Sequence, residues 1–149
     1  MLTKAFERIT TENHSTVLRR SAGIPPTILA ILRAEPISNE PILLNKSLEF
    51  LLDLARISKD TDDAKIHALN ILRFIFQDSF LKNDINKYVT PAMILATENF
   101  KSESWSIRNS ALMCFTSLTK RLLNTTNVQE QDLSKKKGLS TWEFVTKYS

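Results

Sequence analysis

Glycine is nearly absent from this chain: two of its 149 residues are glycine, where about 7% is average. Glycine supplies the positive-φ positions of the many tight turns that β-sandwiches, barrels and doubly wound sheets require. Leucine (20 residues) and isoleucine (13) greatly outnumber valine (4). Because unbranched side chains lose little rotamer freedom in a helix, this composition predicts an all-α fold. The length predicts a single domain over residues 1–149.

Proline, glycine and capping residues divide the chain into segments of helical length. Gly23 fits the C′ stop of one helix, and Pro25-Pro26 fit the first turn of the next, which ends before Pro36. Residues 125–140 are polar and are expected to form a flexible loop. Helices are expected over 3–12, from Ser15 or Thr16 to Gly23, and over 25–35, 41–58, 63–79, 91–100 and 103–124, with a short closing helix after Thr141. A further helix is expected to open at Asn83 or Asp84, and Pro91 either interrupts it or begins a new one.

Three of the expected helices carry a similar pentapeptide, at residues 18–22, 66–70 and 107–111. The first and third share the pattern aliphatic-Arg-x-Ser-Ala, and the three starts lie 48 and 41 residues apart. A period of about 40–47 residues built from helix pairs is typical of HEAT and armadillo repeats. The pattern predicts HEAT/armadillo-like helical repeats, an α-solenoid fragment, with an ordinary helical bundle as the alternative.

The residue types and spacings of an active site are missing from the sequence. Gly23 and Gly138 stand alone, so no glycine-rich loop for a phosphate or a cofactor is present. One cysteine excludes an internal disulfide, and the spacing of His14, His67 and Cys114 does not fit a zinc site. Cys114 lies in an apolar helix and is expected in the core. We therefore expect no enzyme activity, no cofactor and no metal site.

Two sets of polar residues remain open to a functional or a structural interpretation. His67, Asn70, Arg73 and Gln77 form a polar stripe on an otherwise apolar helix and could line a groove. Arg108 is expected to pair with Glu103 or with a helix dipole, which favours a structural role for it.

Arg19 and Arg20 stand one turn before Gly23 and the proline-led helix start at Pro25. Guanidinium groups beside exposed helix N–H groups suit a phosphate or a carboxylate. The alternative is a structural corner, in which one arginine caps the carbonyl groups at the end of its own helix. The residues alone leave these two interpretations equal.

The net charge of +4 resides mainly in residues 101–149, around Lys135 to Lys137. This balance is compatible with nucleic acid binding without requiring it. No apolar run approaches the roughly 20 residues of a membrane span, and the first residues lack the apolar core of a signal peptide. A cytoplasmic location is expected.

Several ordered segments resemble one protein family. Residues 19–25, Arg-Arg-Ser-Ala-Gly-Ile-Pro, resemble the signature heptapeptide of the thyroid adenoma-associated protein (THADA) family and its yeast relatives. Residues 65–73 with 76–79 resemble the family's "VHALN-LR…F-DS" segment, and 105–111 resemble its "W-VRNS" segment. The ending, from Gly138 to Phe144, is similar to its "T-REFF" stretch. The order and approximate spacing of these segments also match over nearly the whole chain.

The resemblance implies a function in tRNA modification. Members of the family are very large helical-repeat proteins, and they act as the non-catalytic partner of a Trm7/FtsJ-type ribose methyltransferase in tRNA anticodon-loop 2′-O-methylation. The S-adenosylmethionine site then belongs to the separate methyltransferase chain. We expect this chain to be a fragment of the family's central region.

The expected partners are that methyltransferase and, as a second direct contact, tRNA; the alternative is a protein–protein scaffold without RNA contact. A steep weakening of binding with salt would distinguish RNA contact. The candidate partner- or RNA-binding residues are Arg19, Arg20, Ser21, Gly23, Pro25, His67, Asn70, Arg73, Arg108 and Asn109.

Overall fold

The computed structural model describes residues 23–36, 41–56, 62–81 and 84–123, and in these ranges all regular structure is helical. The all-α prediction is therefore confirmed for this part of the chain. The elements are α3 (Ile24–Arg33), α4 (Ile42–Arg56), α5 (Asp62–Gln77), the 3-10 helix η2 (Asn86–Tyr88), α6 (Val89–Asn99) and α7 (Trp105–Leu122). None of these helices is both long and apolar enough to cross a membrane.

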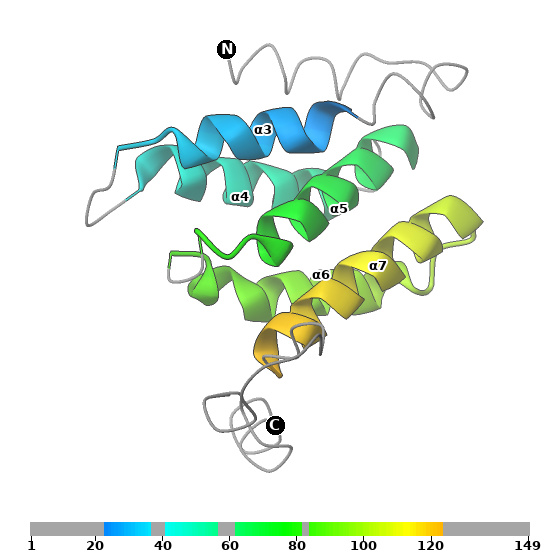
Figure 1. The fold of residues 1–149 in the computed structure, drawn as a ribbon. Helices are drawn as coiled ribbons and strands as arrows, with labels where there is room; N and C mark the ends of the chain where they lie inside the picture. The colour runs from blue at the N-terminus through cyan, green and yellow to red at the C-terminus, as the bar shows by residue number, and fades with distance from the viewer. Residues whose placement is uncertain (1–22, 37–40, 57–61, 82–83, 124–149) are drawn as a thin grey trace, which may run out of the picture.

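The helices form two rows (Figure 1). Helices α3, α5 and α7 run in the same direction and follow one another in the first row, where α5 packs against both α3 and α7. Helices α4 and α6 run in the opposite direction, pack against each other, and cover α5 and α7 respectively. The first row consequently has an amino edge, where α3, α5 and α7 begin, and a carboxyl edge, where they end.

The ends of the helices follow from proline and charge. Pro25 and Pro26 occupy the first turn of α3, and Asp62 and Asp63 the first turn of α5, where their negative charge suits the helix dipole. Gly23 is the N-cap of α3 with a right-handed backbone (φ −82°, ψ −13°). The helix that it was predicted to end lies outside the described residues.

Pro91 lies in the first turn of α6. Its missing N–H costs no helical hydrogen bond there, since the first-turn N–H groups have no partner within the helix. Pro91 therefore does not interrupt a helix; it belongs to the start of α6, which begins two residues earlier at Val89.

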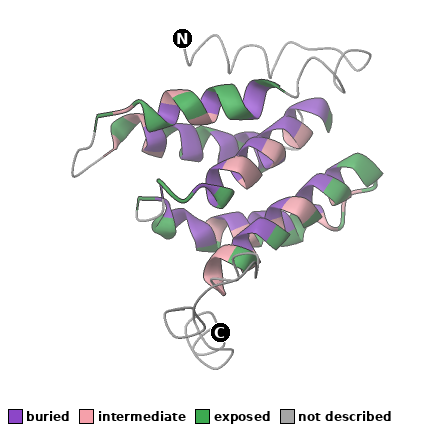
Figure 2. Cartoon of the chain, viewed as in Figure 1, coloured by how far each residue is buried: buried purple, intermediate pink, exposed green. Residues whose placement is uncertain are grey.

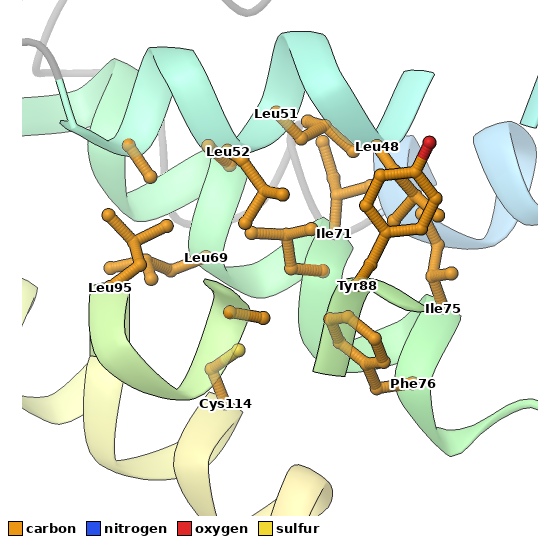
Figure 3. Packing of buried hydrophobic residues seen from close by; sticks show 14 of the residues in the cluster. Leu48, Leu51, Leu52, Leu69, Ile71, Ile75, Phe76, Tyr88, Leu95 and Cys114 are labelled. Atoms are coloured by element: carbon orange, nitrogen blue, oxygen red, sulfur yellow. The ribbon is translucent and has the colours of Figure 1, made fainter. Parts of the chain in front are cut away.

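Helix α5 lies at the centre of the core. Its buried side chains point to several sides of the helix, as the nearly continuous apolar sequence predicts, because α3, α4 and α7 cover most of its surface (Figure 2). Leu48, Leu51 and Leu52 of α4 pack near Ile71 and Ile75, and Cys114 of α7 lies below Leu69 (Figure 3). The fully buried large side chains are Phe76, Ile28, Leu32, Leu44, Leu48, Leu51, Leu69, Ile71, Leu72, Ile75 and Ile85.

Neighbouring helices of the first row are in register at a chain separation of 40 residues. Gln77 Nε2 of α5 donates to Ser117 Oγ of α7 at 2.9 Å, and Arg73 Nη1 lies 3.5 Å from Met113 Sδ. This separation agrees within one residue with the spacing between the second and third predicted repeat units. The first unit (18–22), the expected helix at 3–12, the loop at 125–140 and the closing helix after Thr141 lie outside the described residues.

Candidate functional surface

The sequence segments that resemble the THADA family lie along the first row, and three of them begin at or near its amino edge. Residues 23–25, the described end of the heptapeptide 19–25, begin α3. The segment 65–73 runs along the middle of α5, its continuation 76–79 reaches the carboxyl edge, and 105–111 begin α7. Segments about 40 residues apart in the chain are thus neighbours at one edge (Figure 1). A ligand or partner at this edge would face parts of all three.

The heptapeptide itself is only partly described. Arg19, Arg20 and Ser21 lie outside the described residues. Pro25 is buried and Gly23 is exposed, and a Cβ built on Gly23 would meet no atom within 4 Å. Since its φ is also ordinary for an L-residue, the described structure does not require glycine at this position.

The polar stripe of α5 divides between two sides of the helix. Asn70 and Arg73 are half-buried and Gln77 is exposed, but the side chain of His67 is buried. Residues 67 and 73 are six apart and so lie roughly 120° apart around a helix. His67 therefore belongs to the interior, where a packing role places it, and does not share the side of the helix that Arg73 occupies.

Two of the candidate residues, one on α5 and one on α7, contact the same side chain. Arg73 Nη1 donates to Met113 Sδ at 3.5 Å, and Asn109 Nδ2 donates to the same sulfur at 3.9 Å. The Arg73 guanidinium also lies 6.0 Å from the centre of the Phe74 ring. Arg73 and Asn109, predicted separately from two helices, thus share one polar patch around a sulfur that is only a weak acceptor.

Arg108 has a structural role. Its Nη1 donates to the carbonyl oxygens of Ser102 and Glu103, both at 2.7 Å. These carbonyls belong to the turn between α6 and α7, so the guanidinium fixes that turn to the start of α7. The structural interpretation is supported, but through backbone carbonyls; the contact is not an ion pair with the Glu103 carboxylate.

A buried charge cluster at the carboxyl edge was not foreseen in the sequence. The Asp78 side chain is 1% exposed; it accepts from Arg33 Nε at 2.9 Å and forms an ion pair with the same guanidinium. Its other oxygen accepts from the backbone N–H groups of Phe80 (2.9 Å) and Leu81 (3.1 Å). Asp78 therefore joins the end of α3 to the turn after α5.

Arg121 extends this cluster to α7. Its Nη1 donates to the carbonyl oxygens of Phe76 (3.0 Å) and Asp78 (3.2 Å). Burial lowers the pKa of Arg121, and the negative charge of Asp78 works in the opposite direction. The "F-DS" segment, Phe76 to Ser79, was the available signal for this cluster, but its two arginine partners are more than 40 residues away in the chain.

The one cysteine of the chain is buried in the described part of the fold. Burial raises the pKa of the Cys114 thiol to about 12, so it is protonated at neutral pH and a poor nucleophile. In residues 23–36, 41–56, 62–81 and 84–123, no three His, Cys, Asp or Glu side chains are arranged to hold a metal ion.

Comparison with known proteins identifies the family. The model of the THADA/TRM732 family (DUF2428) matches residues 1–106. The chain is 36% identical over 132 residues to the chicken tRNA (32-2′-O)-methyltransferase regulator THADA and 34% identical to the human one. It is 34% identical over 145 residues to the fission yeast tRNA (32-2′-O)-methyltransferase regulator trm732.

These alignments cover 87–92% of this chain but only 7–10% of the relatives' length. No solved structure is significantly similar. Residues 19–25 and 65–79 lie within the matched residues 1–106, the segment 105–111 extends beyond their end, and the identity to the relatives extends over most of the chain. The chain therefore belongs to the THADA/TRM732 family.

Proposed function

We propose that this chain contributes a non-catalytic part of a regulator of tRNA 2′-O-methylation at position 32, with the methyl transfer carried out by a separate methyltransferase. The observation that carries the proposal is the family match over residues 1–106, whose relatives are named as regulators of that methylation. The buried, protonated Cys114 and the lack of a glycine-rich loop agree with a non-catalytic role.

The architecture suits such a role. The two rows of helices and the 40-residue register between α5 and α7 support a HEAT/armadillo-like solenoid segment. In a solenoid each repeat contacts only its neighbours, so the row of parallel helices forms an extended surface for a large partner. We propose that the first row, α3, α5 and α7, provides that surface.

The residues we assign to contact are those at or near the amino edge of that row. The heptapeptide 19–25 ends at the start of α3, and Asn70, Arg73 and Asn109 lie on α5 and α7. The partner we propose is a Trm7/FtsJ-type ribose methyltransferase in the cytoplasm, with tRNA as a second contact. His67 and Arg108 would act indirectly, since one is buried and the other holds a turn.

The experiment is a capture and an activity assay with the same variants. For the capture, the chain is expressed together with the methyltransferase. For the activity assay, cells that lack their own regulator express a full-length relative carrying this segment, and 2′-O-methylation at tRNA position 32 is measured by mass spectrometry. The variant Arg19→Ala with Arg20→Ala is expected to lower methylation at least tenfold. The matched control, Lys135→Ala with Lys136→Ala, removes the same charge and is expected to change methylation less than twofold.

Circular dichroism melting of the chain separates the remaining interpretations. Loss of capture with an unchanged melt would support a contact role for the arginine pair. Loss of capture together with a lowered melting temperature would favour the structural corner. Full capture and methylation in the double variant would contradict the assignment, and capture that is insensitive to both RNA removal and salt would favour a protein scaffold without RNA contact.

A further inference from the structure

A cationic depression lies at the amino edge, where the two rows of helices meet. It has a volume of about 320 Å³ and is open to solvent, near the lower end of the roughly 300–1,000 Å³ of ligand sites. The end of α4, the start of α5, the end of α6 and the turn before α7 each supply part of its wall. The lining residues are Ala55, Arg56, Lys65, Leu95, Glu98, Asn99, Lys101 and Ser102.

The charge around this depression is unbalanced. Arg56, Lys65 and Lys101 come from three separate elements, and Glu98 is the single carboxylate among the lining residues. In the described part of the chain, no carboxylate forms an ion pair with any of these three cations; the ion pair found there joins Arg33 to Asp78. Like charges gathered around one opening repel each other, and an anion between them relieves that repulsion.

The three cations can converge because of the helix directions. Helices α4 and α6 end where α5 begins, so three chain segments that are distant in sequence supply one side chain each to the same place. Asn99 is buried and its Nδ2 donates to the Leu95 carbonyl at 2.9 Å, which fixes the floor of the depression. The site is thus built on helix ends whose positions the core determines.

An exposed aromatic residue follows the last lining residue of the depression closely in the chain. Trp105, the first residue of α7, follows Ser102 by three residues and is 68% exposed. A tryptophan so exposed loses the benefit of burying its large apolar surface. Cationic grooves combined with exposed aromatic rings are typical of single-stranded nucleic acid sites, because the cations follow the phosphates and the bases stack on the rings.

We propose that Arg56, Lys65 and Lys101 bind a backbone phosphate of single-stranded RNA, and that Trp105 stacks on a neighbouring base. This inference deepens the proposed function, since it gives the chain its own RNA contact. The chemistry recognised is a phosphodiester, and the ring contact distinguishes RNA from free phosphate.

The test measures binding of a fluorescein-labelled RNA stem–loop to the 149-residue chain. The variant Arg56→Gln, Lys65→Gln, Lys101→Gln is compared with Lys46→Gln, Lys87→Gln, Lys120→Gln, which removes three exposed lysines away from the depression. The first variant is expected to weaken binding at least tenfold and the second less than threefold. The slope of log K against log salt is expected to fall by about 0.7 for the first variant, since the three cations share one phosphate and each single-strand phosphate contact contributes about 0.7.

A second measurement tests the stacking. In a Trp142→Phe background, Trp105 is the remaining tryptophan, and its fluorescence is expected to be quenched as the RNA binds. Trp105→Leu is expected to weaken RNA binding about tenfold. Inorganic phosphate, used as the competitor, is expected to displace the RNA only at concentrations far above that of the RNA.

Several results would overturn the proposal. Equal losses in the two triple variants would mean general attraction without a site. Competition by inorganic phosphate as strong as by unlabelled RNA would mean a generic anion site. RNA binding that is intact in the depression variant, with capture of the methyltransferase lost, would assign these cations to a protein contact. If methylation is supported although the chain binds no RNA, the assignment of RNA binding to the depression is wrong and the proposed function stands. If capture and methylation both fail, the proposed function itself fails.

Discussion

The two edges of the first row use the same residue types in opposite ways. At the carboxyl edge, the buried Asp78 carboxylate holds Arg33 and lies beside Arg121. At the amino edge, Arg56, Lys65 and Lys101 surround a depression with one carboxylate, and no described carboxylate pairs with them. The charged residues that join helices at the carboxyl edge are therefore paired with an opposite charge. The cations at the amino edge have no described carboxylate partner and remain available to bind an anion.

The difference also has an energetic side. Breaking a buried ion pair leaves an uncompensated charge in a poorly solvated place and is costly, while removing a solvated cation is nearly free. The carboxyl edge should consequently respond to substitution through stability, and the amino edge through binding.

Replacing Asp78 should have the largest effect. Asp78→Ala removes the acceptor of Arg33 and of the N–H groups of Phe80 and Leu81, and it leaves Arg121 half-buried without its neighbouring negative charge. We expect a loss of about 3 kcal/mol in the free energy of unfolding. Urea denaturation followed by circular dichroism measures it.

The control for this variant is Asp78→Asn, which keeps an oxygen for the two N–H groups but removes the charge. Its loss should lie between that of Asp78→Ala and that of Arg33→Ala. The Arg33 side chain is 51% exposed, but its removal leaves the buried Asp78 carboxylate without its ion-pair partner, so we expect a loss of about 2 kcal/mol. A loss below about 1 kcal/mol for Asp78→Ala would show that the cluster does not hold the carboxyl edge together.

The next prediction compares two arginines that both donate to backbone carbonyls. Arg121 joins α7 to the end of α5, whereas Arg108 bonds to the turn directly before its own helix. Arg121→Met should cost about 2 kcal/mol and Arg108→Met below about 1 kcal/mol. Only the first substitution removes a contact between helices and takes a donor away from the carbonyl groups of two buried residues, Phe76 and Asp78. Equal losses in urea denaturation would remove the distinction between the edges.

The sequence was sufficient for features that depend on neighbouring residues. The 3.6-residue period predicted the helices that became α4 and α5, and the nearly continuous apolar surface of 63–79 predicted a helix covered on most sides. The rules for proline predicted the start of α3. The spacing of 41 residues between two pentapeptides anticipated the register of α5 and α7.

Features that depend on distant residues were not predictable in the same way. Asp78 is in a loop, and its partner Arg33 lies 45 residues earlier, so nothing local shows that its charge is buried. The depression collects cations from three elements, each of which alone reads as an ordinary solvated side chain. The polar stripe alone does not show that His67 is buried, because spacings of three residues drift around a helix, away from the side that Arg73 occupies.

The smallest expected change concerns Gly23 at the amino edge. Its φ is −82° and a Cβ at this position would meet no atom within 4 Å, so Gly23→Ala fits sterically. Alanine is a poorer N-cap than glycine, but it also reduces the conformational entropy of the unfolded chain. These opposing terms should leave the free energy of unfolding within about 0.5 kcal/mol of the unaltered chain.

Gly23 therefore gives the sharpest test of whether the amino edge serves a partner. If glycine is present because a methyltransferase or RNA backbone approaches closely, Gly23→Ala should weaken capture of that partner while urea denaturation stays unchanged. The neighbouring substitution Thr27→Ala is the control, since Thr27 is exposed and its Oγ1 donates only to the Gly23 carbonyl at 2.7 Å. Unchanged capture would mean that no backbone approaches Gly23 and that the contact lies elsewhere on the row. A large loss of stability would instead mean that this edge, like the carboxyl edge, is held by the chain's own packing.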